Sequence, residues 1–182
     1  MRILLINGSV HENGATAGVL NYVKNELTRL GDTVDTVHIG SGARHTCLAC
    51  GGCGGGKGCV MGDIDDLSAL AARADGIIVA TPTHYAAPCA TLCAALTRLC
   101  KSRRRELFGK YVATVAVGRR AGVCEAADAL YKFFEFTGAV RIGASYPLAV
   151  FGTVDDDAEG RGYLYETCQN MHAAYYKDHG DR

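Results

Sequence analysis

The regular alternation of short apolar runs with longer segments of helical periodicity constrains this chain more than any other feature. Residues 2–7 read RILLIN and are almost entirely apolar, as expected of a strand that is buried on both faces. Val19, Val23 and Leu27 then recur at a spacing of four, which predicts the buried side of a helix. The same pattern continues along the chain. We expect further strands in residues 34–39, 75–81, 111–117 and 140–150, and further helices in residues 64–74, 92–99, 126–136 and 156–176.

Strands that alternate with helices in this way indicate a parallel sheet with helices on both faces. We therefore predict an α/β fold, a flavodoxin-like three-layer sandwich with a five-stranded parallel sheet in the order 2-1-3-4-5. Two local signals predict helix starts, namely Asp63 as an N-cap and Pro88 near a first turn. The 182 residues fit a single domain with a cysteine-rich insertion at about residues 43–62. Ligands of such a sheet bind beyond the carboxyl ends of its strands.

Charge and hydropathy exclude two classes of partner. Lys and Arg together number 19, as do Asp and Glu, so the formal net charge is zero and we expect no nucleic-acid partner. The apolar run at the start is far too short for an export signal or a membrane span. We therefore expect a cytoplasmic protein without a membrane partner, in which thiols stay reduced.

Three strand-end loops carry candidate binding residues. Residues 7–16 read NGSVHENGAT and lead into a helix, so their backbone N–H groups can bind an anion; a plain capped turn is the alternative. Residues 81–88 read TPTHYAAP, whose rings suit the edge of a planar ligand or belong to a rigid connection. Residues 117–122 read VGRRAG, and their arginines either contact an anionic ligand or are solvated charges.

Four of the nine cysteines lie in one glycine-rich loop, with the spacing C-x2-C-x2-C-x5-C. Zinc, a pair of disulfides, an iron–sulfur cluster and a loop of free thiols are the alternatives. Structural zinc sites use two separated cysteine pairs, and disulfides are rare among reduced thiols. The compact spacing is typical of a loop that wraps an iron–sulfur cube. We expect a 4Fe-4S cluster, with the metal ligands Cys47, Cys50, Cys53 and Cys59.

The remaining cysteines and a cationic run have simpler interpretations. Cys89, Cys93 and Cys100 share the helical spacing of neighbouring leucines, so we interpret them as small core residues. Residues 101–106 read KSRRRE. We interpret this run as a solvated helix end, with the docking of an acidic electron carrier as the alternative.

The motifs INGSVHENGAT, ATPTHYAAPCATLCAALTR and VGRRAG, together with the loop cysteines, resemble an iron–sulfur flavoprotein of the NADPH-dependent FMN reductase superfamily. The resemblance extends to about Phe136 and implies FMN as a cofactor. It places the FMN phosphate at Ser9, His11, Asn13, Ala15 and Thr16. It places the isoalloxazine ring between two groups of residues: Thr81, Pro82, Thr83, His84 and Tyr85 on one side, and Gly118, Arg119, Arg120 and Gly122 on the other. Val10, His11 and Ala15 replace the proline, arginine and asparagine usual in the family, which weakens the expected phosphate contacts.

The predicted function is electron transfer between a flavin and an iron–sulfur cluster, with a ferredoxin or NAD(P)H as donor. One alternative is an NAD(P)H-dependent reductase of flavin, quinones, azo or nitro compounds without a cluster. The other is a non-catalytic, redox-sensing flavin module. The resemblance also implies a homodimer or homotetramer.

Overall fold

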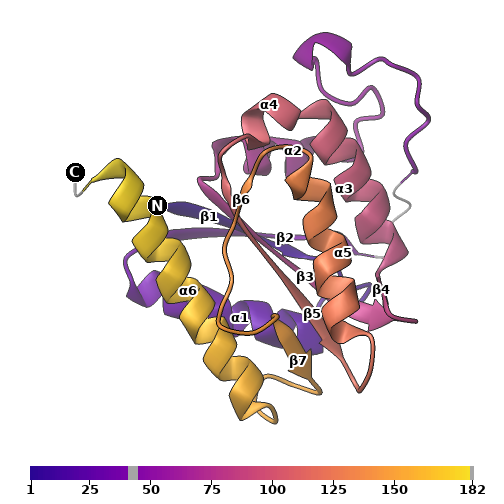
Figure 1. Cartoon of the computed structure of the whole chain (residues 1–182). Coiled ribbons are helices and arrows are strands. Elements are labelled where there is room, and N and C mark those ends of the chain that lie inside the picture. The colour runs from indigo at the N-terminus through magenta and orange to yellow at the C-terminus, as the bar shows by residue number, and fades with distance from the viewer. Residues whose placement is uncertain (41–44, 181–182) are drawn as a thin grey trace.

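In the computed structural model, which describes residues 1–40 and 45–180, a sheet lies between two layers of helices (Figure 1). Its strands are β1 (Arg2–Asn7), β2 (Thr33–His38), β3 (Gly76–His84), β4 (Ala87–Pro88), β5 (Tyr111–Gly118), β6 (Val140–Arg141) and β7 (Ala149–Phe151). The helices are α1 (Ala15–Arg29), α2 (Asp65–Arg73), α3 (Ala90–Ser102), α4 (Arg104–Leu107), α5 (Val123–Glu135) and α6 (Ala158–His179), with a short 3-10 turn, η1 (Gly54–Gly56). The α/β, flavodoxin-like architecture is confirmed.

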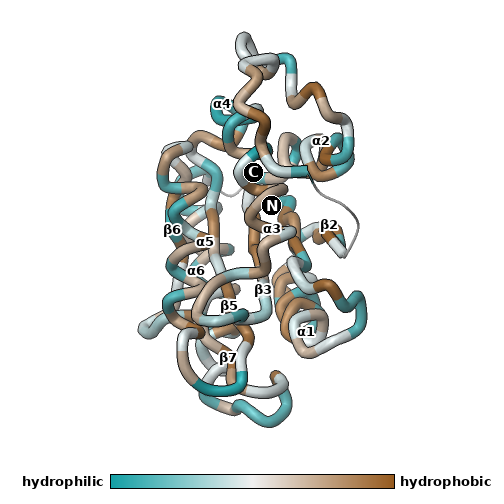
Figure 2. The backbone as a smooth tube through the Cα atoms, turned by 90° about the vertical axis from the view of Figure 1, so that its right-hand side faces the viewer, coloured by the Kyte–Doolittle hydropathy of each residue, from teal (hydrophilic) through white to brown (hydrophobic). Residues whose placement is uncertain are grey.

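The core forms on both faces of the sheet because β1, β3 and β5 are buried on both sides. Residues of β1 alternate between the two faces, so Leu4 and Ile6 pack with α2, α3 and α5, while Ile3 and Leu5 pack with α1 and α6. All of these side chains are fully buried. Figure 2 shows the molecule with the carboxyl ends of β3 and β5 facing the viewer. None of the helices within the described ranges is long and apolar enough to cross a membrane.

The sheet differs from the predicted five-stranded order 2-1-3-4-5. Within the described residues it has seven strands, of which five follow the path β2-β1-β3-β5-β6, while β4 lies beside β3 and β7 beside β5. The single strand predicted over residues 140–150 is wrong, because it divides into β6 and β7, which both pair in parallel with β5. Between them Pro147 has no N–H to donate. Ser145 also turns away, donating from its backbone N and its Oγ to Glu166 of α6 at 3.1 and 2.7 Å.

The third strand also continues past its predicted end at residue 81. It extends to His84 and returns as β4, which pairs with it in antiparallel fashion. Tyr85 and Ala86 form the turn with φ angles of 51° and 60°. Two successive positive φ angles characterise a type I′ turn, which suits the twist of a two-residue hairpin. Pro88 therefore lies in β4, and not in the first turn of α3.

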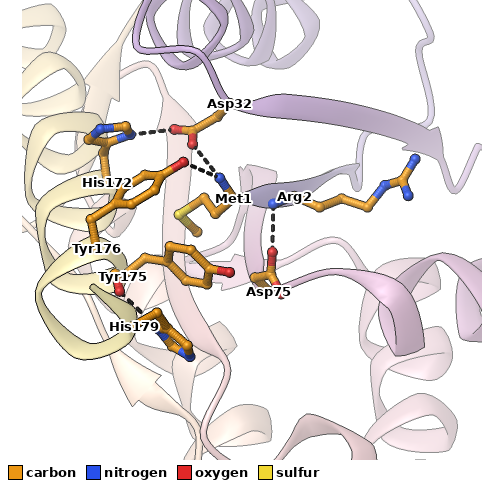
Figure 3. A network of polar contacts seen from close by, with 8 residues as sticks. All are labelled: Met1, Arg2, Asp32, Asp75, His172, Tyr175, Tyr176 and His179. Atoms are coloured by element: carbon orange, nitrogen blue, oxygen red, sulfur yellow. Dashed lines mark hydrogen bonds and ion pairs between the residues drawn. The ribbon is translucent and has the colours of Figure 1, made fainter. Parts of the chain in front are cut away.

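A polar network attaches the C-terminal helix to the start of the sheet (Figure 3). The Met1 amino group donates to Asp32 Oδ1 and to the Tyr176 hydroxyl, both at 2.8 Å. His172 Nδ1 lies 3.0 Å from the other carboxylate oxygen, Asp32 Oδ2. Because the Asp32 side chain is fully buried, these contacts hold α6 against the start of β1.

Candidate functional site

The loop between β1 and α1 is ordered by its own side chains. Ser9 N donates to Asn7 Oδ1 at 3.0 Å, and His11 N donates to Ser9 Oγ at 3.1 Å. Ser9 and Thr16 are buried, whereas His11 and Asn13 are exposed. Helix α1 begins after Gly14 with no side-chain cap and no acidic residue in its first turn. Its first backbone N–H groups are therefore available to an anion such as a phosphate.

The loops after β3 and β5 lie against each other. A Cβ atom built on Gly118 would lie 3.1 Å from Thr83 Oγ1, and one built on Gly122 would lie 2.5 Å from the Ala86 Cβ. Gly122 has a φ of 81°, so both its conformation and its contacts require glycine. Thr83 Oγ1 is buried and has no hydrogen-bond partner among the described residues. An orphaned hydroxyl between two converging loops fits a polar ligand such as the edge of a flavin ring.

The other residues predicted to contact the ring have different surroundings. Thr81 is fully buried and its hydroxyl accepts from Cys89 N at 2.9 Å, so it orders the loop. Tyr85, Arg119 and Arg120 are exposed at the rim of the same end of the sheet. The structure thus brings all three predicted flavin loops to the carboxyl ends of the strands, where Gly8 N also bonds the Ala80 carbonyl at 2.8 Å.

The four loop cysteines line one small cavity. They share it with Arg98, Lys101 and Ser102 of α3, and its volume is about 20 Å³. All four thiols are free. Within residues 1–40 and 45–180, no three His, Cys, Asp or Glu side chains are positioned to hold a metal ion. The cavity is close to the size of a single water molecule. The donor set is therefore that of a four-thiolate site, but the loop would have to rearrange to enclose a cube.

Arg98 is the functional residue that the sequence pattern fails to reveal. Its side chain is 1% exposed, although the residue occurs in an LTRLC stretch that reads as an ordinary amphipathic helix. Its Nε donates to Cys59 Sγ at 3.3 Å, and its Nη1 donates to the His45 carbonyl at 3.1 Å and to Asp63 Oδ2 at 2.8 Å. Its Nη2 donates to Asp63 Oδ1. One guanidinium therefore holds the start, the last cysteine and the end of the cysteine loop.

This contact also corrects the predicted role of Asp63. Ile64 occupies the N-cap position of α2 and no side chain caps that helix, so the prediction of an Asp63 cap is wrong. The hydrogen bonds from Arg98 instead lower the pKa of the Asp63 carboxyl. A second cation, Arg103, lies beside the loop, where its Nη2 would be 3.4 Å from a Cβ on Gly58. Its Nε is buried without a partner in the described part of the chain. Two guanidiniums beside four thiols suit an anionic thiolate centre.

The cysteine loop and the flavin loops lie toward opposite ends of α3. Figure 1 shows β4 at the start of this helix, whereas the cysteine loop lies beside its far end, next to α4. At 1.5 Å per residue, the eight steps from Ala90 to Arg98 correspond to about 12 Å along the helix axis. Of the predicted insertion at about residues 43–62, residues 45–62 lie toward the far end of α3, and residues 43 and 44 lie outside the described ranges.

The cysteines outside the loop behave mainly as small apolar residues. Cys89, Cys100 and Cys168 are buried, and burial raises the pKa of the Cys100 and Cys168 thiols to about 12. Cys93 is half-buried and its pKa is also raised by burial, whereas Cys124 is exposed. The interpretation of Cys89 and Cys100 as core residues is confirmed.

Comparison with known proteins identifies the family. The model of the family described as NADPH-dependent FMN reductase matches residues 1–153. The chain belongs to this family. It is therefore a flavin-dependent oxidoreductase, and the predicted flavoprotein resemblance is confirmed.

Curated relatives of this family member include two archaeal proteins named iron–sulfur flavoprotein. The one from Archaeoglobus fulgidus is 29% identical over 161 residues, covering 86% of this chain and 73% of the relative. The one from Methanosarcina thermophila is 26% identical over 178 residues, covering 94% of this chain and 93% of the relative.

Solved structures of low sequence identity share the fold. An NADH:FMN oxidoreductase in its apo form superposes with a TM-score of 0.70 at 19% identity, covering 95% of this chain and 89% of that chain. A flavodoxin from the domain Archaea superposes with a TM-score of 0.68 at 12% identity, covering 96% and 98%. These two likenesses show a common flavodoxin-like fold.

Proposed function

We propose that this protein is an FMN-dependent redox protein that transfers electrons between its flavin and a 4Fe-4S cluster. The cluster would be held by Cys47, Cys50, Cys53 and Cys59, and a ferredoxin or NAD(P)H would be the donor. The observation that carries the proposal is the set of four free thiols lining one cavity beside a buried guanidinium. The names of the archaeal relatives support it. When bound, a flavin exchanges electrons in pairs or singly, and an iron–sulfur cube exchanges them one at a time.

The side chains of the chain itself bind and orient, and none is required as a general acid or base. The uncapped start of α1 offers backbone N–H groups and a helix dipole to the FMN phosphate. The buried Thr83 hydroxyl offers a hydrogen bond to the polar edge of the ring. Arg98 donates a hydrogen bond to Cys59, which orients this thiol, and it places positive charge beside the thiol cavity.

We also propose that the protein assembles as a homodimer or homotetramer. The length of α3 separates the cysteine loop from the flavin loops within one chain, so the cysteine loop of a second chain offers a shorter path to the flavin. Size-exclusion chromatography with light scattering tests this assembly. A monomer at micromolar concentration would contradict it.

Anaerobic purification followed by iron, sulfide and flavin analysis tests the proposed cofactors. We expect about four irons and four sulfides per chain, FMN as the released flavin, and a broad brown absorbance beneath the flavin bands. Cys50→Ala should lose the iron and this absorbance but keep FMN, because the flavin loops lie at the other end of α3. Cys124→Ala removes an exposed thiol outside the loop and serves as the matched control. Full iron in the Cys50→Ala variant would exclude this ligand set.

The second candidate function is an NAD(P)H-dependent reductase of flavin, quinones, azo or nitro compounds that has no cluster. The small size of the thiol cavity favours it, since about 20 Å³ leaves no room for a cube without a movement of the loop. This function predicts a clean yellow flavin spectrum. It also predicts turnover with NAD(P)H that Cys50→Ala leaves unchanged.

A further inference from the structure

The outer surface between α3 and α5 carries an apolar groove of about 550 Å³. We call it the α3–α5 groove; its principal lining residues are Thr97, Lys101, Arg104, Lys132, Phe133 and Phe136. A second hollow adjoins it and is lined by Arg104, Phe108 and Phe136 among others. Phe108 and Phe136 are 74% and 75% exposed. Two exposed phenylalanines at adjoining hollows are typical of an interaction surface.

Cations surround this apolar surface. Lys101, residues 103–105 and Lys132 supply five positive charges, and the acidic residues that line these hollows in the described part of the chain are Glu106 and Glu135. This corner of the molecule therefore has an excess of three positive charges, although the whole chain is neutral. A surface with an apolar centre and a cationic rim is complementary to a partner with an apolar centre and an acidic rim.

The same cations also border the cysteine loop. Lys101 lines the thiol cavity, and Lys101 and Arg104 line a further hollow together with Gly51, Cys53 and Gly54 of the loop. Figure 1 shows the loop beside α4, at the end of the molecule where α3 finishes. A protein docked on the α3–α5 groove would therefore lie over the cysteine loop and away from the flavin loops.

We propose that the α3–α5 groove is the docking site for an acidic protein that carries single electrons. This inference rests on the proposed function for the nature of the partner, because the cysteine loop lines a hollow that shares Lys101 and Arg104 with the groove. A second copy of the chain is a poorer occupant. A two-fold contact would place the same patch on both sides, so both copies would bring an excess of positive charge to the contact.

Isothermal titration calorimetry at low salt tests the proposal. It measures the binding of an oxidised, acidic bacterial-type ferredoxin to the anaerobically purified holoprotein. The variant Arg104→Gln/Lys132→Gln removes two rim cations and should weaken the dissociation constant about tenfold. Phe136→Ser should weaken it by a similar factor without any change of charge. The control Lys24→Gln/Arg29→Gln removes two cations from α1, on the opposite face of the sheet. It is closely matched, because Arg29 and Lys132 each pair with a glutamate three residues away.

The control variant should bind like the wild type, and the affinity of the wild type should fall as salt rises. Equal affinities for groove and control variants would overturn the proposal, as would the absence of wild-type binding at low salt. A homodimer that Phe136→Ser converts to monomers would also overturn it, since the groove would then be a contact between copies.

A stopped-flow experiment tests the proposed function separately. It measures how fast reduced ferredoxin reduces the flavin of the Cys50→Ala variant. If that variant is reduced as fast as the wild type while the groove variants still lose binding, the electron relay fails and the docking site stands. If the groove variants bind normally while Cys50→Ala blocks reduction, the docking site fails and the relay stands.

Discussion

Removal of the Asp63 carboxylate should strongly destabilise the protein, because it leaves a buried guanidinium without its counter-charge. The Arg98 side chain is 1% exposed and that of Asp63 is 22% exposed. Breaking a buried ion pair from one side costs about 3–5 kcal/mol. Because water reaches Asp63, we expect Asp63→Asn to lower the free energy of unfolding by about 3 kcal/mol, at the lower end of that range.

Urea unfolding of the cofactor-free, reduced protein measures this loss as a shift in midpoint at constant m-value. Glu106→Gln breaks the partly exposed pair with Arg103 and should cost about 0.5 kcal/mol, as surface pairs do. Arg98→Met/Asp63→Asn should be more stable than Asp63→Asn alone, because it removes the uncompensated charge. A loss below about 1 kcal/mol for Asp63→Asn, or no coupling in the double-mutant cycle, would refute the reasoning.

The same pair predicts a pH dependence with a definite sign. Arg98 lowers the pKa of Asp63 in the folded protein, so the folded state binds this proton less readily than the unfolded state. The resulting stability is fully present above the unfolded-state pKa of about 3.9. It is lost as the pH falls through the lower folded-state pKa. The stability difference between the wild type and Asp63→Asn should therefore be constant near neutral pH and should shrink below about pH 4.

Three further substitutions test the flavin loops and the packing of α6. Gly122→Ala should destabilise the protein by about 2 kcal/mol, since a left-handed alanine is strained and its Cβ would meet Ala86. The variant should also bind FMN more weakly in a fluorescence titration, and wild-type FMN affinity would contradict this. Thr83→Val should leave the cofactor-free protein as stable as the wild type, because the hydroxyl has no partner within the described residues, but should weaken FMN binding about tenfold. An unchanged FMN dissociation constant would exclude the proposed hydrogen bond. Asp32→Asn should lower the free energy of unfolding by about 3 kcal/mol in thermal or urea melts, because it breaks the fully buried ion pair with the Met1 amino group. A loss within error of zero would rule out that pair as a stabilising contact.

The sequence by itself determined the architecture and the positions of the candidate loops. Continuous apolar runs such as residues 2–7 and 111–117 can satisfy their burial only inside a sheet that is covered on both faces. The loops after those strands must then meet at one edge. The spacing of the loop cysteines similarly indicated a thiolate centre before any contact was known. The inferences about the strands and their loops succeed because each depends on residues that are close together in the chain, whereas the thiolate centre stays a prediction.

Only the tertiary structure decided which distant residues support the site. Arg98 and Asp63 are 35 residues apart, and an arginine among helical leucines has the same local pattern whether it is buried or solvated. The division of the last strand likewise depends on Ser145 reaching Glu166 of α6, and the β3–β4 turn lies against Gly122 after β5. Periodicity records which face of an element is buried. It does not record which partner lies opposite, because that depends on the packing of every element at once.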